Sequence, residues 1–221
     1  MVKNESDIFN FRKIPIYWEV TEKLEIPKLR GIELNTDEVD LDLVPFHEFY
    51  KIDKRKRGEK TVHFFLADYL FERTFTKIDQ TAEFLFSAKM VLSPDFSLYT
   101  NMPLVMQMFN HYRKMFVSKY WQELFDMKVI PVACWSDRRS FDFCFDGMPK
   151  NSLIAVSSVG VCRNKEAKEN FTVGYEKMIE TLEPTQILWY GRELPCIDRS
   201  IQHIFVQPDY DDRFKKDINR A

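Results

Sequence analysis

The feature that most constrains the fold is an alternation of short apolar runs with amphipathic stretches along most of the chain. The runs that predict strands are 62–66, 89–93, 129–134, 152–158, 187–190 and 204–206. Several are apolar throughout, as in strands covered on both faces. Between them, apolar residues recur at the i, i+3, i+4 spacing of a helix in 67–87, 101–125 and 165–182. The pattern predicts an α/β fold of parallel β-α-β units.

The number of strands separates two α/β architectures. With 44–50 and the N-terminal segment added, there are roughly eight strand candidates, which is the count of a closed barrel. A chain of 221 residues is short for such a barrel, and several crossovers lack a full helix. We therefore expect a compact or irregular (β/α) barrel-like domain over residues 29–208, with an open doubly wound sheet as the second choice.

Both ends of the chain are expected to lie outside this domain. Residues 209–221 form a charged C-terminal tail, and residues 1–28 form an extended N-terminal arm. In the arm, every second residue from 14 to 20 is apolar, which predicts an edge strand or a clamp. These apolar residues are Ile14, Ile16, Trp18 and Val20. The arm also carries four aromatic residues: Phe9, Phe11, Tyr17 and Trp18. We expect them to pack on the arm's own domain, with a host or phage protein as the alternative partner.

Several functional classes are excluded by missing patterns. The six glycines are isolated, and no GxGxxG or GxxxxGK[ST] motif occurs, so neither NAD binding nor an ATP P-loop is expected. The four cysteines include no CxxC pair, which argues against zinc. No apolar run approaches the ~20 residues of a membrane span, and residues 1–25 do not resemble a signal peptide. We expect no membrane association and a cytoplasmic location.

Polar residues follow the predicted strands, at the edge where parallel α/β proteins gather their functional groups. We interpret four of them as a catalytic set: Asp95, Asp137, Asp142 and Arg163. Five more are interpreted as ligand-binding residues: Ser93, Trp135, Ser157, Ser158 and Tyr190. Carboxylates beside an arginine suit acid/base chemistry or a divalent cation such as Mg²⁺. The alternative is structural, because Asp and Ser after strands commonly cap helices and close turns.

Two segments between the strands have unusual composition. In 140–146 (SFDFCFD) rings alternate with acids, which predicts a hairpin strand that seals one end of the barrel. Residues 51–60 carry six basic and two acidic side chains between two predicted strands, which predicts a hairpin tip. Its residues Lys54, Arg55, Lys56 and Arg57 are candidate contacts for nucleic acid phosphates, although a solvated charged turn is the alternative.

Residues 89–191 resemble a family of unknown function found in bacteriophages and mobile elements of Gram-positive bacteria. The similar segments are 92–99 (LSPDFSLY), Asn110, Tyr112, Arg113, Trp121, 129–135 (VIPVACW), 139–150 (RSFDFCFDGMPK), 157–161 (SSVGV) and 187–191 (ILWYG). The resemblance implies a phage or mobile-element origin and therefore a bacterial host cell. It implies no reaction, cofactor or substrate.

Three functions remain open at this point. The first is an enzyme-like α/β domain that binds a small ligand, a nucleotide or a divalent ion at the acidic rim. The second is a non-enzymatic phage protein that inhibits a host or defence factor through the N-terminal arm. The third is a replication accessory that binds nucleic acid through residues 51–60, although the net charge of −2 counts against a globally basic nucleic acid binder.

Overall fold

The computed structural model describes residues 14–34 and 41–208, and these form two parallel sheets. The first sheet has the order β1 (Leu43–Pro45), β2 (Thr61–His63), β3 (Met90–Leu92) and β4 (Val129–Ile130). The second has the order β5 (Leu153–Ser157), β6 (Gln186–Tyr190) and β7 (Gln202–Val206). Within both sheets the strands pair in parallel, and an isolated parallel bridge between Val132 and Ala155 links the sheets. The predicted α/β class is confirmed.

The strand order follows the sequence from β1 to β7. It lacks the reversal that marks a doubly wound sheet, which favours the first expectation, a barrel-like domain, over the open doubly wound sheet. The two sheets also turn toward each other, because side chains from β2 and β6 meet between them. The rings of His63 and Phe65 lie 4.9 and 4.7 Å from the ring of Tyr190.

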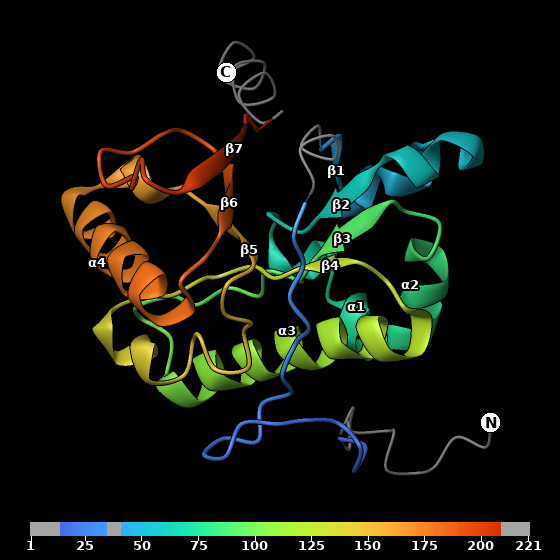
Figure 1. Cartoon of the computed structure of the whole chain (residues 1–221), viewed down its shortest axis with the longest axis horizontal. Helices are drawn as coiled ribbons and strands as arrows, with labels where there is room; N and C mark the ends of the chain where they lie inside the picture. Colours follow the sequence, from blue (N-terminus) through green and yellow to red (C-terminus); the bar gives the residue numbers. More distant parts are fainter. Residues whose placement is uncertain (1–13, 35–40, 209–221) are drawn as a thin grey trace.

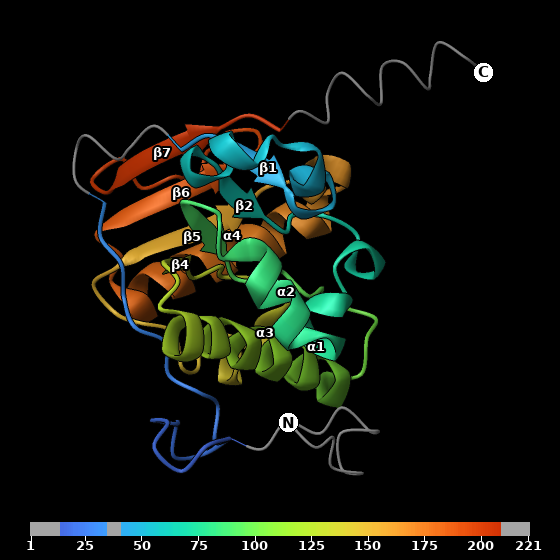
Figure 2. The same cartoon turned by 90° about the vertical axis from the view of Figure 1, so that its right-hand side faces the viewer.

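Four α-helices of the described residues cover the outside of the strands (Figures 1 and 2). They are α1 (Arg73–Thr76), α2 (Ile78–Leu85), α3 (Leu104–Phe125) and α4 (Lys165–Leu182). In Figure 1, α3 runs beneath both sheets, whereas α4 lies beside the second sheet. As expected from the sequence, several crossovers lack a full helix: 3₁₀-helices η3 (Phe46–Lys51) and η4 (Lys54–Glu59) connect β1 to β2.

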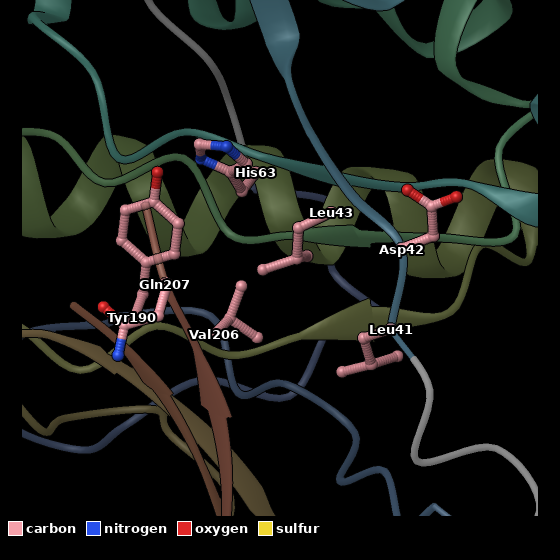
Figure 3. A pocket seen from close by; sticks show the side chains of 7 residues that line it. All are labelled: Leu41, Asp42, Leu43, His63, Tyr190, Val206 and Gln207. Carbon is pink, nitrogen blue, oxygen red and sulfur yellow. The ribbon is translucent and has the colours of Figure 1, made fainter. Parts of the chain in front are cut away.

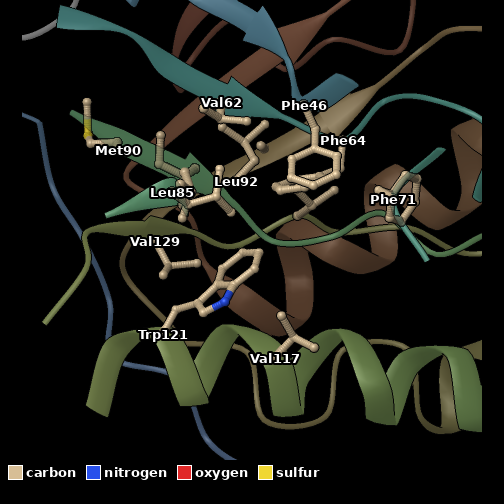
Figure 4. Close-up of a cluster of buried hydrophobic side chains, with 14 of the residues drawn as sticks. Phe46, Val62, Phe64, Phe71, Leu85, Met90, Leu92, Val117, Trp121 and Val129 are labelled. Atoms are coloured by element: carbon tan, nitrogen blue, oxygen red, sulfur yellow. The ribbon is translucent and has the colours of Figure 1, made fainter. Parts of the chain in front are cut away.

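The main core lies between the first sheet and its helices (Figure 4). Val62, Val91 and Val129 are paired across three neighbouring strands and therefore share one face of the sheet. Trp121 of α3 packs on this face, and its ring stacks on that of Phe64 at 5.7 Å. The opposite faces of these strands are buried as well, because they line the space between the two sheets. Burial on both sides explains why the strand sequences are continuously apolar.

Several local predictions are wrong. Of the predicted strand 44–50, only residues 44 and 45 are extended, as the end of β1, and the rest belongs to η3. Because β1 and β2 are parallel, residues 51–60 form a crossover that contains η4, not a hairpin tip. Residues 140–146 are not a strand: η6 (Arg138–Asp142) begins where the Asp137 carboxylate accepts a hydrogen bond from the Arg139 amide, and a turn follows it.

In the described part of the N-terminal arm, Trp18 packs on the domain as expected, whereas Ile16 and Tyr17 are exposed, and the predicted edge strand does not form. Residues 14–20 include a turn in which Trp18 is buried against Phe116, with ring centroids 5.4 Å apart. Phe9 and Phe11 lie outside the described residues. Further along, Ile32 and Leu34 cross the amino ends of β5 and β6, where the Gln186 side chain bonds both backbone groups of Leu34. No helix of the described residues is long and apolar enough to cross a membrane.

Candidate functional site

The four predicted catalytic residues do not share interaction partners. Asp137 is held by Arg139, whose Nη2 lies 2.7 Å from the carboxylate, and these hydrogen bonds keep the pKa of Asp137 below its ordinary value. The pair lines a pocket of about 350 Å³ beside α4. Asp142 and Arg163 are exposed on η6 and η7 (Val161–Arg163). Within the described residues, no hydrogen bond or ion pair connects any of these three with Asp95.

Asp95 lies in a buried polar cluster with Lys114 and Cys134. The Lys114 side chain is fully buried and donates to the backbone oxygen of Val132 at 2.9 Å and to Cys134 Sγ at 3.3 Å. Burial raises the pKa of Asp95 to about 6, although the positive charge of Lys114 opposes the shift. Burial also raises the pKa of Cys134 to about 12, so this residue is a thiol at neutral pH and not a nucleophile.

The end of β3 explains the position of Lys114. The Ser93 amide donates to the Ile130 carbonyl, and the next carbonyl on the same side of the chain is that of Val132, two residues beyond β4. The chain turns away at Pro94, so no β3 amide reaches Val132, and the Lys114 ammonium takes that place. Ser93 Oγ and Asp95 Oδ1 are buried without a hydrogen-bond partner in the described part of the chain.

Three of the predicted ligand-binding residues make structural contacts. Trp135 donates from Nε1 to the Asn170 carbonyl at 3.2 Å and lies against α4. Ser157 Oγ accepts from the Val159 amide, and Ser158 Oγ donates to the Arg192 carbonyl at 2.7 Å. The two serine contacts stabilise the turns after β5 and β6, which is the structural alternative to ligand binding.

Tyr190 is the predicted ligand-binding residue that lines a pocket. The pocket has a volume of about 300 Å³ and lies between β1 and β7, the two outer strands of the sheets (Figure 3). Its lining residues are Leu41, Asp42, Leu43, His63, Tyr190, Val206 and Gln207. Figure 3 shows the Tyr190 hydroxyl directed toward the side of His63, with Asp42 at the other end of the group. Asp42 is already ion-paired with Lys60.

His63 is the titratable residue at this end of the pocket. Burial, with a contribution from His47, lowers the pKa of His63 to about 3, so the ring is neutral across the physiological range. Its Nδ1 accepts the Phe65 amide at 3.3 Å, which assigns the ring proton to Nε2. The side chain therefore offers a neutral hydrogen-bond donor.

Sequence reasoning missed both His63 and Lys114. The carboxyl-end rule missed His63 because the predicted strand 62–66 continues past it, whereas β2 ends at this histidine. Lys114 carries no comparable signal, because a lysine within a long helix is ordinarily solvent-exposed.

The part of the chain that the structure describes contains no cluster suited to the divalent cation that the sequence left open beside acid/base chemistry. Among residues 14–34 and 41–208, no group of three or more His, Cys, Asp or Glu side chains is placed to hold a metal ion. Among the acids predicted at the rim, Asp95 has the most unusual environment. The charged group beside its carboxylate is the Lys114 ammonium.

Comparison with known proteins assigns the family. The family described as "Domain of unknown function (DUF4417)" matches residues 18–210. The chain belongs to the DUF4417 family. The chain is 35% identical over 210 residues to the Gene 1 protein of Mycobacterium phage L5, a match that covers 95% of this chain and 88% of that protein. It is also 34% identical over 160 residues to the Gene 1 protein of Mycobacterium phage D29, covering 72% of this chain and 59% of that protein.

These DUF4417 relatives confirm the expected kinship with an uncharacterised phage family. No solved structure matches the chain. The family description gives no activity, so a function has to be argued from the geometry of the pocket and its surroundings.

Proposed function

We propose that this DUF4417 protein binds a small polar ligand in the pocket between β1 and β7. The proposal depends on one observation: His63 from the first sheet and Tyr190 from the second meet at this pocket, with ring centroids 4.9 Å apart. In parallel α/β proteins, ligands bind near the carboxyl ends of strands, and both residues occupy such ends.

The lining favours a planar molecule that carries a hydrogen-bond acceptor. His63 Nε2–H is a donor, and the Tyr190 ring and the side chains of Leu43 and Val206 supply apolar surface. The volume of about 300 Å³ lies at the lower end of the range for ligand pockets, which suits a group the size of a nucleobase. The neutral state of His63 disfavours a ligand that requires a cationic partner.

The experiment is a calorimetric titration with a panel of nucleobases and nucleosides. At least one should bind, and the variant His63→Phe, which keeps an aromatic ring but removes the donor, should weaken that binding by about tenfold or more. Tyr190→Ala should weaken it as well, since it removes the stacking surface.

Arg138→Ala is the matched control, because Arg138 lines the separate pocket beside α4. It should leave the affinity unchanged. The proposal is wrong if no panel member binds the wild-type protein, or if His63→Phe and Arg138→Ala have the same effect on affinity.

A further inference from the structure

We infer that the β1–β2 connection and the C-terminal end of α2 bind a single-stranded polynucleotide. Three adjoining segments carry this surface: Tyr50 and Lys51 of η3, residues 54–57 of η4, and Phe86 directly after α2. Figure 1 shows them on the side of the first sheet that faces away from β5, β6 and β7. The surface shares no residue with the pocket that contains His63, so it is independent of the proposed function.

The basic side chains of this surface divide into two groups. Arg55 is used locally: it bonds the Asp53 carboxylate that caps η4, with Nη2 2.9 Å from Oδ2. Lys54 and Lys56 are exposed and enter no ion pair with any described residue, and Lys51 lies 3.8 Å from Glu48 at the margin. Asp53 is thus neutralised by Arg55, and the two lysines beside it are available to phosphates.

Arg57 holds the three segments together. Its guanidinium lies 5.1 Å from the ring centroid of Phe49 and 5.3 Å from that of Phe84, and it donates to the backbone oxygens of Ile52 and Tyr50. It is therefore a scaffold residue and not the phosphate contact that the sequence suggested. By joining η3, η4 and α2 it fixes the positions of the neighbouring side chains, which lowers the entropic cost of binding.

Two large aromatic side chains flank these lysines without being buried. Tyr50 is 61% exposed and Phe86 is 64% exposed. Tyr50 belongs to η3, whose backbone Arg57 bonds, and Phe86 precedes Ser87, whose carbonyl lies beside Gly58 of η4. Exposed rings next to lysines are the usual arrangement for single strands, because unpaired bases stack on the rings while phosphates contact the ammonium groups.

A single strand fits better than a duplex for two reasons. Among the described residues, this surface carries three exposed lysines: Lys51, Lys54 and Lys56. That number is small for binding a double helix, which is recognised mainly through its phosphates. Bases in a duplex are already stacked on each other, so Tyr50 and Phe86 would gain nothing from it. The net charge of −2 also disfavours binding that depends on phosphate attraction alone.

The test measures binding affinity by fluorescence anisotropy. The labelled probes are oligo-dT and oligo-U of 15 nucleotides and a duplex of the same length. We expect at least one single strand to bind more tightly than the duplex, and a plot of log affinity against log salt with a slope of about −2 for three phosphate contacts. The ratio of the oligo-dT and oligo-U affinities shows whether DNA or RNA is preferred.

Two double variants separate the two contributions. Lys54→Glu with Lys56→Glu should lower the single-strand affinity by about tenfold or more and flatten the salt dependence. Tyr50→Ala with Phe86→Ala should lower it by about tenfold or more while leaving the salt slope unchanged. All four side chains are exposed, so circular dichroism should show unchanged folding.

Lys165→Glu with Lys168→Glu is the control, since these exposed lysines of α4 carry the same charge change elsewhere. The control should bind as the wild type does. The inference is overturned if neither single strand binds at low salt, if the duplex binds as tightly, or if the control loses as much affinity as the Lys54 and Lys56 variant.

Discussion

At the scale of single residues, the buried cluster around Lys114 gives a pH-dependent stability that can be measured. Burial raises the folded-state pKa of Asp95 to about 6, above the ordinary value of 3.8. The folded state therefore favours the protonated carboxyl group. The stability that this protonation contributes is lost as the pH rises from about 4 through about 6. Relative to Asp95→Asn, which cannot ionise, the wild type should lose on the order of 2 kcal/mol between pH 4 and pH 7.

The measurement is urea denaturation of both proteins at several pH values. Two buried histidines act in the opposite direction: burial lowers the pKa of His63 and of His111 to about 3, so both proteins lose stability as the pH falls from 6.5. Because both proteins contain these histidines, the difference between them isolates Asp95. A difference that does not vary with pH would contradict the placement of Asp95 in a buried setting.

Residue roles could be predicted from the sequence only where local position decides them. The carboxyl-end rule reached Tyr190, which lines the pocket, and Asp95, whose environment is unusual. It also selected Trp135, Ser157 and Ser158, whose observed contacts are structural. The partners that distinguish these cases, such as the Val132 carbonyl for Lys114, come from distant parts of the chain.

At the scale of elements, predictions succeeded where the chain carries explicit start and stop signals. Helix α4 spans Lys165–Leu182 as predicted: Asn164 caps it by accepting the Ala167 amide, and Glu183 ends it in a left-handed conformation before Pro184. The segment 140–146 has a period-two pattern too short to distinguish a strand from a 3₁₀ turn. The pairing of β1 with β2 could not be predicted, because a charged connection is compatible with a hairpin or a crossover.

Gly174 gives a test of how α4 packs. Within a helix, Gly→Ala ordinarily stabilises by about 1 kcal/mol. Here a Cβ on Gly174 would lie 2.0 Å from Trp135 Nε1, so Gly174→Ala should destabilise the protein by about 1–3 kcal/mol. In a Trp135→Ala background the same substitution should be neutral or stabilising. Chemical denaturation of the four proteins of this cycle gives the coupling free energy, and a stabilising effect of Gly174→Ala in the wild type would show that α4 does not contact Trp135 closely.

At the scale of the whole molecule, the two sheets are joined by more than the bridge between Val132 and Ala155. One apolar cluster includes Val62 and Trp121 on the side of the first sheet and Leu188 and Ile204 of the second. Helix α3 runs beneath both sheets (Figure 1), and Leu34 is bonded to Gln186 at the start of β6. The α/β class followed from the sequence because periodicity is local. The open seam between β1 and β7, where the pocket lies, could not be predicted from the sequence, because it depends on how far the strands curl.

This shared core predicts that the sheets unfold together, which also tests the expectation of a single domain over residues 29–208. Trp121 reports on the core of the first sheet and Trp189 on that of the second. The chain has four tryptophans, so Trp18 and Trp135 are first replaced by Phe. In that background Trp121→Phe leaves Trp189 as the fluorescence probe, and Trp189→Phe leaves Trp121. After correction for the stability change caused by each substitution, measured by circular dichroism on the same samples, each fluorescence transition should coincide with the loss of secondary structure. A calorimetric enthalpy of unfolding equal to the van't Hoff enthalpy would support the same conclusion.

A fluorescence midpoint displaced from the circular dichroism midpoint in either variant would contradict it. One sheet would then unfold without the other, and the seam between β1 and β7 would separate two independent units.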